Sequence, residues 1–203
     1  MYHTDRYIPT KKNFIYQLDE MGDLTLSKPE QSKSRFDRYV DDLDNVKDVK
    51  GDLIKLAKDD NFDYIVHGCN CYQTMGAGIA KAIKNGFPEA DKADFEYGRI
   101  GDSTKAGEFS VAHINDKLTV INFYTQVSPG SDFNIKHLEN CCKKFYEFLQ
   151  DEPIITRKYF EVGFPWIGCG IGGGDKMEVL KVLADLNNGY GEEKICNVTI
   201  VEL

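Results

Sequence analysis

HGCNCYQTMGAGIA at residues 67–80 and IGCGIGGGD at residues 167–175 are the two stretches of this chain that say most about its architecture. Each follows an apolar, strand-like run and precedes a helix-like one. A unit of strand, glycine loop and helix directs unpaired backbone N–H groups and the positive end of the helix toward one place, which suits a phosphate group. Two such units predict one α/β domain that binds a ligand with two or more phosphates.

Outside these loops, strand-like and helix-like segments alternate from about residue 45 onward. Apolar residues recur at helical spacing, as at Leu138, Cys142 and Phe145, and a turn at Asn115 and Asp116 joins two neighbouring strands. Strands separated by helices predict a mostly parallel sheet that is covered on both faces, with the ligand beyond the carboxyl ends of the strands. The predicted strands are 63–68, 108–113, 118–124, 159–168 and 194–203, and the predicted helices are 76–87, 134–150 and 175–187.

Residues 1–44 differ from the rest and are expected to form an N-terminal extension to a single domain at residues 45–203. They carry many alternating charges and the polar run SKPEQSKSRFDRYVDD at residues 27–42. Residues 13–27 alternate apolar and polar side chains around a turn at 21–23, which indicates a small hairpin. A partly ordered tail is the alternative.

The composition restricts the class of protein. With 203 residues, of which 41% are hydrophobic, the chain can bury a core, and its net charge is −8. No run of lysine and arginine offers the basic face that non-specific nucleic-acid binding needs. No apolar stretch approaches the roughly 20 residues that span a bilayer, and the first 20 residues lack a secretory core. We therefore expect a cytoplasmic protein without membrane contact.

The cysteines do not indicate a metal site. They occur as Cys-x-Cys and Cys-Cys pairs, which do not match zinc-finger spacing, and the four histidines are not placed to complete such a site. Free thiols are the better interpretation for an intracellular protein. The expectation is therefore no metal and no cofactor. The six residues are Cys69, Cys71, Cys141, Cys142, Cys169 and Cys196.

Four polar residues stand where chemistry is expected. Asp52 either accepts a hydrogen bond from an exocyclic amine such as that of adenine, or caps a helix. His67, at a strand end, is either an acid, base or donor to a ligand oxygen, or a histidine with structural partners. Asn70 either holds a ribose hydroxyl or is a turn residue. Asp175 lies at the mouth of the second glycine loop and is suited to cap the following helix as well.

The glycines themselves favour a ligand. The segment from Gly76 to Ile79 is a shortened form of the dinucleotide pattern, and it lacks the lysine and hydroxyl residue of a P-loop. Glycine costs about 0.5–1 kcal/mol at an ordered position, so the run of glycines between 168 and 174 is better explained by close approach of a ligand than by packing.

Taken in order, these motifs resemble a macrodomain. They are Gly51, Asp52 and Leu53, then VHGCN at 66–70, then GAGI at 76–79, then the glycine loop at 168–174. The resemblance covers residues 45–203 and implies a three-layer α/β/α fold that binds ADP-ribose and its derivatives. It also implies that Asp52 holds the adenine amine, that Asn70 contacts the distal ribose, and that the backbone of both loops surrounds the diphosphate.

The resemblance also points to a branch of the family. Hydrolases that remove ADP-ribose from acidic side chains often have a lysine where this chain has Gln126 and an aspartate where it has Gly172, and another branch has an aspartate after the position of Gly78. The pattern HGCNC at 67–71 instead resembles the ADP-ribose 1″-phosphate phosphatase branch. In that branch the histidine helps to act on the terminal phosphate. We expect the distal ribose and its phosphate to point toward His67, Asn70 and Asp175, which are the candidate catalytic residues.

The expected function is therefore hydrolysis of ADP-ribose 1″-phosphate to ADP-ribose and phosphate. Two alternatives are a non-catalytic module that reads ADP-ribose, free or on modified proteins, and a hydrolase that removes ADP-ribose from proteins with the help of Asp175. Leu203 is a further candidate for the adenine pocket. The expected ligand-binding residues are Asp52, Leu53, Gly76, Ala77, Gly78, Ile79, Tyr124, Gly168, Cys169, Gly170, Ile171, Gly172, Gly173 and Gly174.

Overall fold

A computed structural model describes residues 15–18, 24–27, 45–152 and 159–203, and it divides the chain into two compact units, Met1–Tyr39 and Val40–Leu203. In the first unit, β1 (Ile15–Leu18) pairs with β2 (Leu24–Ser27) in antiparallel fashion. The two strands of the predicted hairpin are therefore present, and its turn at 21–23 lies outside the described residues. The domain boundary expected at residue 45 stays a prediction.

The second unit is built on one sheet of six strands. Neighbouring strands are parallel except at one edge, where β5 runs antiparallel to β6 and Phe109 lies opposite Phe123. The predicted mixed, mostly parallel sheet is thus confirmed. In sheet order, the strands are β3 (Lys47–Lys50), β8 (Cys196–Glu202), β7 (Phe160–Phe164), β4 (Tyr64–Asn70), β6 (Thr119–Gln126) and β5 (Phe109–His113).

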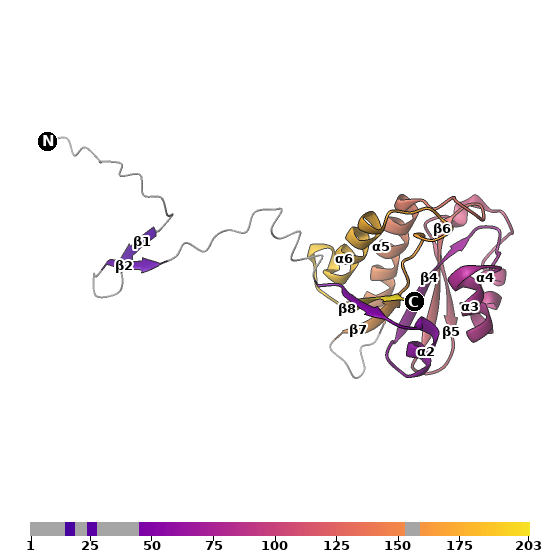
Figure 1. The fold of residues 1–203 in the computed structure, drawn as a ribbon, viewed down its shortest axis with the longest axis horizontal. Helices are drawn as coiled ribbons and strands as arrows, with labels where there is room; N and C mark the ends of the chain where they lie inside the picture. Colours follow the sequence, from indigo (N-terminus) through magenta and orange to yellow (C-terminus); the bar gives the residue numbers. More distant parts are fainter. Residues whose placement is uncertain (1–14, 19–23, 28–44, 153–158) are drawn as a thin grey trace. The chain divides into compact units, whose positions relative to one another are not determined.

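Helices cover both faces of this sheet and complete three layers (Figure 1). One face carries α2 (Leu53–Lys58), α3 (Gly78–Gly86) and α4 (Pro88–Glu96), and the other carries α5 (Ile135–Asp151) and α6 (Lys176–Asn187). Two short 3₁₀ turns, η1 (Ser103–Lys105) and η2 (Gly189–Gly191), lie in the connections. The α/β/α architecture expected from the sequence is therefore confirmed.

Alternation along the central strand assigns its side chains to the two faces. Tyr64 and Val66 of β4 pack in the core cluster beneath α5 and α6, whereas Ile65 packs in the cluster beneath α2, α3 and α4. This follows from the two-residue period of a strand. By the same period, His67 lies on the side of Ile65, which matters for its role.

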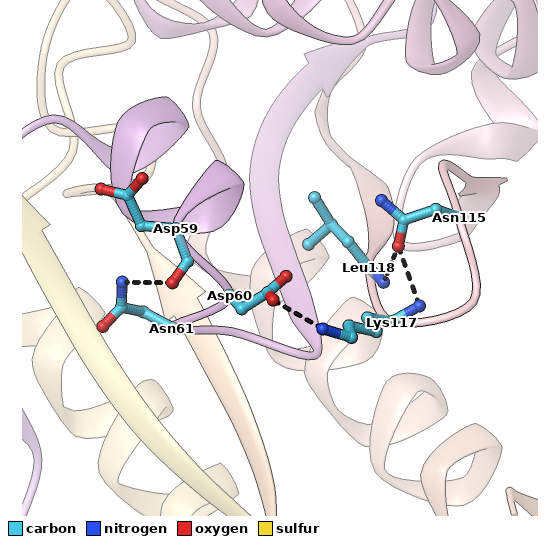
Figure 2. A network of polar contacts seen from close by, with 6 residues as sticks. All are labelled: Asp59, Asp60, Asn61, Asn115, Lys117 and Leu118. Carbon is cyan, nitrogen blue, oxygen red and sulfur yellow. Dashed lines mark hydrogen bonds and ion pairs between the residues drawn. The ribbon is translucent and has the colours of Figure 1, made fainter.

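The turns at the amino ends of β4 and β6 are held together by polar contacts (Figure 2). Lys117 Nζ lies 2.6 Å from Asp60 Oδ2, and Asn115 Oδ1 accepts hydrogen bonds from the backbone N–H groups of Lys117 and Leu118. The turn predicted at Asn115 is thus present. It lies at the edge of the sheet opposite the carboxyl ends of the parallel strands, and it leaves those ends free for a ligand.

Within the described residues, no helix has both the length and the apolar character needed to cross a membrane.

Candidate ligand pocket

The carboxyl ends of the parallel strands surround a cavity of about 780 Å³. Its walls come from the turn between β3 and α2, the end of β4, the start of α3, the loop after β6, the glycine loop after β7, the start of α6 and the end of β8. A cavity of this size is in the range of small-molecule and cofactor sites. Both glycine loops contribute to it, as the sequence predicts.

Most of the catalytic and ligand-binding residues expected from the sequence line this pocket, and a few do not. Those that line it are Asp52, Leu53, Asn70, Gly76, Ala77, Gly78, Ile79, Gly168, Cys169, Gly170, Ile171, Gly172 and Leu203. Those that do not line it are His67, Tyr124, Gly173, Gly174 and Asp175.

Asp52 stands at one end of the pocket and has two tasks. Its Oδ1 accepts hydrogen bonds from the N–H groups of Ile54 at 2.8 Å and Lys55 at 3.1 Å, which makes it the N-cap of α2. Both bonds go to the same oxygen, so the carboxylate keeps acceptor capacity for a ligand. The two readings of Asp52, helix cap and ligand acceptor, are therefore compatible.

Asn70 stands at the other end, where β4 passes into the first loop. Its Nδ2 donates to Thr74 Oγ1 at 2.8 Å, and its Oδ1 accepts from the N–H of Tyr72 at 3.0 Å. Asn70 thus folds the loop back on itself while it lines the pocket. Thr74 lines the pocket beside it.

The helix α3 begins at the first loop without a side-chain cap. Its N-cap residue, Ala77, has an extended backbone and makes no side-chain hydrogen bond, and Gly78 takes the left-handed conformation with φ of 53°. The first N–H groups of a helix have no partner within the helix. Because Ala77, Gly78 and Ile79 line the pocket, these groups and the positive helix end are available to an anion there.

The glycine loop after β7 contains glycines that packing requires and one glycine that faces open space in the pocket. A Cβ on Gly168 would lie 2.1 Å from Cδ2 of Phe133, and one on Gly174 would lie 2.6 Å from Cδ1 of the same ring. These two glycines are therefore required by packing, which corrects the interpretation that packing does not explain the loop. A Cβ on Gly170 would meet nothing within 4 Å, and Gly170 lines the pocket.

His67 is completely buried in the sheet and does not reach the pocket. Its Nε2 lies 2.7 Å from Asn122 Oδ1, and Asn122 Nδ2 in turn donates to Ala90 O and Ser110 Oγ. Burial lowers the pKa of His67 from 6.5 to about 4, so the ring is neutral near pH 7 and donates from Nε2. Contrary to the expectation from the HGCNC pattern, His67 has a structural role.

Comparison with known proteins supports these observations. A model of the macro domain family matches residues 66–183. The chain belongs to the macro domain family. An uncharacterized 17.5 kDa protein from the tk-vs intergenic region of Enterobacteria phage T4 is 40% identical over 137 residues, which is 64% of this chain and 82% of the phage protein.

Solved macro domains share its fold. The macrodomain of Mycobacterium tuberculosis DarG aligns with a TM-score of 0.62 and 20% identity, over 78% of this chain and 98% of that one. Thermosipho africanus DarTG in complex with ADP-ribose aligns with a TM-score of 0.57 and 18% identity, over 77% of this chain and 42% of that one. At these identities the likeness concerns the fold.

Two further residues that the sequence suggested are structural in this macro domain. Asp175 Oδ1 accepts hydrogen bonds from the N–H groups of Met177 at 2.8 Å and Glu178 at 3.0 Å, so it caps α6. Tyr124 is fully buried, its hydroxyl donates to Asp94 Oδ1 at 2.8 Å, and its ring stacks on Tyr97. The capping role was expected for Asp175, and Tyr124 belongs to the core beneath the first loop.

The macro domain pocket also contains residues that sequence reasoning did not select. Thr74, Trp166, Lys176 and Glu202 line it without belonging to any recognisable motif. Glu202, at the end of the last strand, could have been predicted as a pocket residue, because the carboxyl ends of parallel strands meet at one edge of the sheet. Lys176 and Trp166 offered no signal, since no local motif places their side chains beside each other or beside Glu202.

The remaining groups in the pocket do not form a metal site. Among the described residues, no group of three or more His, Cys, Asp or Glu side chains could hold a metal ion. All six cysteines are unpaired thiols. Cys169 is the one that lines the pocket, and partial burial raises the pKa of its thiol above the ordinary value.

Proposed function

We propose that this macro domain binds ADP-ribose and derivatives of it that carry a substituent on the distal ribose. One observation carries the proposal. A single pocket has a carboxylate with spare acceptor capacity at one end, an amide side chain at the other, and the uncapped start of α3 beside a glycine loop along its length. The family and the ADP-ribose complex of the Thermosipho protein supply the ligand class.

In this arrangement, each part of the ligand meets a suitable group. The adenine amine donates a hydrogen bond to Asp52. The diphosphate oxygens accept hydrogen bonds from backbone N–H groups at the start of α3 and in the loop at Gly170. The distal ribose lies next to Asn70. The positive helix end offsets part of the diphosphate charge, which a protein with a net charge of −8 does not attract by its overall field.

A binding test follows from the open space at Gly170. We expect Gly170→Val to fold normally, because a Cβ there meets nothing and Gly170 is not among the residues with positive φ. The side chain would fill the pocket and abolish ADP-ribose binding in isothermal titration calorimetry. An unchanged melting temperature is the control. Retained affinity in a folded Gly170→Val variant would show that the ligand does not occupy this pocket.

Hydrolysis of ADP-ribose 1″-phosphate is a second candidate function. It is favoured by the distribution of charge, because the acidic side chains that line the pocket, Asp52 and Glu202, belong to the end formed by β3 and β8. The end formed by β4 and β6 presents Asn70, Thr74 and Gln126, which are uncharged and do not repel a phosphate. Water would add to phosphorus, the bond from phosphorus to the 1″ oxygen would break, and a proton from the water would pass to that oxygen, so that ADP-ribose and inorganic phosphate leave.

Phosphorus NMR separates the possible activities. Free phosphate that appears with ADP-ribose, in a mixture of protein and ADP-ribose 1″-phosphate, would support the phosphatase. Shifted and broadened diphosphate signals without turnover would favour a reader of ADP-ribose. Release of ADP-ribose from a modified protein, with the 1″-phosphate left intact, would favour a de-ADP-ribosylating hydrolase instead.

A further inference from the structure

Charge is unevenly distributed around the pocket. Among the described residues that line it, Lys176 is the only one with a cationic side chain. Lys176 is the first residue of α6, directly after the cap at Asp175. A cation at the amino end of a helix is disfavoured by the helix dipole, so the helix itself does not stabilise this lysine.

Two neighbours hold Lys176 in place. Its Nζ lies 2.6 Å from Glu202 Oε1 and 4.7 Å from the centre of the Trp166 ring. The hydrogen bond and the charge of Lys176 lower the pKa of Glu202 below its ordinary value. The side chains of Lys176 and Glu202 are 51% and 41% exposed, and ion pairs as exposed as this one contribute little stability. Lys176 can therefore exchange Glu202 for another anionic partner at a small cost in stability.

The pair lies at the end of the pocket that the adenosine half of the ligand would occupy. The backbone oxygen of Glu202 accepts a hydrogen bond from the N–H of Gly51 at 2.8 Å, which joins the end of β8 to the turn that carries Asp52. A ligand whose adenine meets Asp52 therefore brings the phosphate next to adenosine toward this region.

We infer that Lys176 is a specificity-determining residue that leaves Glu202 and pairs with a phosphoryl group on the adenosine half of the ligand. This inference rests on the proposed function. The diphosphate as a whole, or a terminal phosphate such as that of AMP or a 2′-phosphate, carries about two negative charges against the one of a carboxylate, and the start of α6 favours an anion at the same place. Trp166 keeps the lysine close to the pocket during the exchange, since its ring face attracts the ammonium group.

Two phosphoryl groups have the chemistry that Lys176 would recognise. One is the adenosine-side phosphate of the diphosphate, which AMP and ADP-ribose both contain. The other is a phosphate on the 2′ oxygen of the adenosine ribose, as in ADP-ribose 2′-phosphate. If Lys176 pairs with the adenosine-side phosphate, it should strengthen binding of AMP but not of adenosine. If it pairs with the 2′-phosphate, it should strengthen binding of ADP-ribose 2′-phosphate alone.

Calorimetric titration of the full chain with these four ligands tests the inference. We expect Lys176→Met, which keeps the apolar stem, to bind phosphate-bearing ligands about three- to tenfold more weakly, as for the loss of a partly exposed charged hydrogen bond. Adenosine should bind equally well. Glu202→Gln should bind the same ligands more tightly, because it frees the ammonium group and removes a negative charge.

Lys84→Met is the matched control. Lys84 forms a similarly exposed ion pair with Asp91 at 2.8 Å, outside the pocket, so its loss should change no affinity. The opposite signs expected for Lys176→Met and Glu202→Gln distinguish a direct contact from general disruption. If unaltered protein binds ADP-ribose and both variants bind all four ligands as it does, the inference is overturned and the proposed function stands. If unaltered protein binds none of them, both are overturned.

Discussion

Burial dominates the chemistry of His67. The imidazole loses its hydration in the layer between the sheet and α4, and the hydrogen bond to Asn122 offsets only part of that loss, so the pKa falls to about 4. A group that is neutral in the native state and protonated in the unfolded chain links folding to pH. His67 therefore affects the stability of this domain in acid.

The sign and the size of this effect follow from the two pKa values. Between pH 6.5 and about 4 the unfolded chain binds a proton at His67 that the native state does not bind, so the free energy of unfolding decreases as the pH falls through this window. The full loss is about 3 kcal/mol. Urea unfolding at pH 7, 6 and 5 should show a steeper decline for the unaltered protein than for His67→Gln. Parallel declines would contradict the assignment of His67 as a buried neutral group.

At the scale of residues, sequence reasoning identified backbone positions better than side-chain directions. Asp52, Asn70 and the GAGI segment were placed in the pocket because they follow strand ends, and all of them line it. His67 was also placed at a strand end, but the two-residue period turns its side chain into the core. Tyr124 is buried in the same way. Which face of a strand points to a site depends on the register of the sheet, which no local motif specifies.

At the scale of elements, the start of α6 depends on the cap at Asp175. We expect Asp175→Ala to lower the free energy of unfolding by about 1 kcal/mol, whereas Asp175→Asn should be close to neutral because asparagine caps helices equally well. Denaturant unfolding of both variants measures this. If Asp175 instead oriented a catalytic water, Asp175→Asn would lose turnover of ADP-ribose 1″-phosphate while it kept its stability.

Helices and strands with a strong apolar pattern were predicted accurately, and those with a weak pattern were not. The helix α5, with Leu138, Cys142, Phe145 and Leu149 buried at helical spacing, was predicted within one residue at each end. By contrast, α4 was missed because it buries only Ala90 and Asp94 among its nine residues. The six-residue helix α2 was not predicted as an element, and only the alternative interpretation of Asp52 as a helix cap pointed to it.

At the scale of the whole molecule, the described residues that line the pocket all lie between Gly51 and Leu203. We therefore expect a chain that begins at Val40 to bind ADP-ribose with the affinity of the full chain, since Val40–Leu203 is a compact unit. Calorimetry on both proteins, with equal melting temperatures as the control, tests this. Weaker binding by the shorter chain would mean that residues before Val40 contribute to the site.

The architecture as a whole was predictable because the order of its motifs is more specific than any motif alone. Two glycine loops at the ends of parallel strands must meet at one edge of a sheet, and this is sufficient to predict the pocket. The contacts of Lys176 with Trp166 and Glu202 were not predictable, because they join the start of α6, the loop after β7 and the end of β8, which only tertiary packing brings together.

The position of Leu203 has a practical consequence. This residue lines the pocket and is 93% exposed, so anything joined to its carboxyl group would emerge at the rim of the cavity. An affinity tag fused there would crowd the opening. A small fluorophore attached at the same point would instead report directly when the cavity fills.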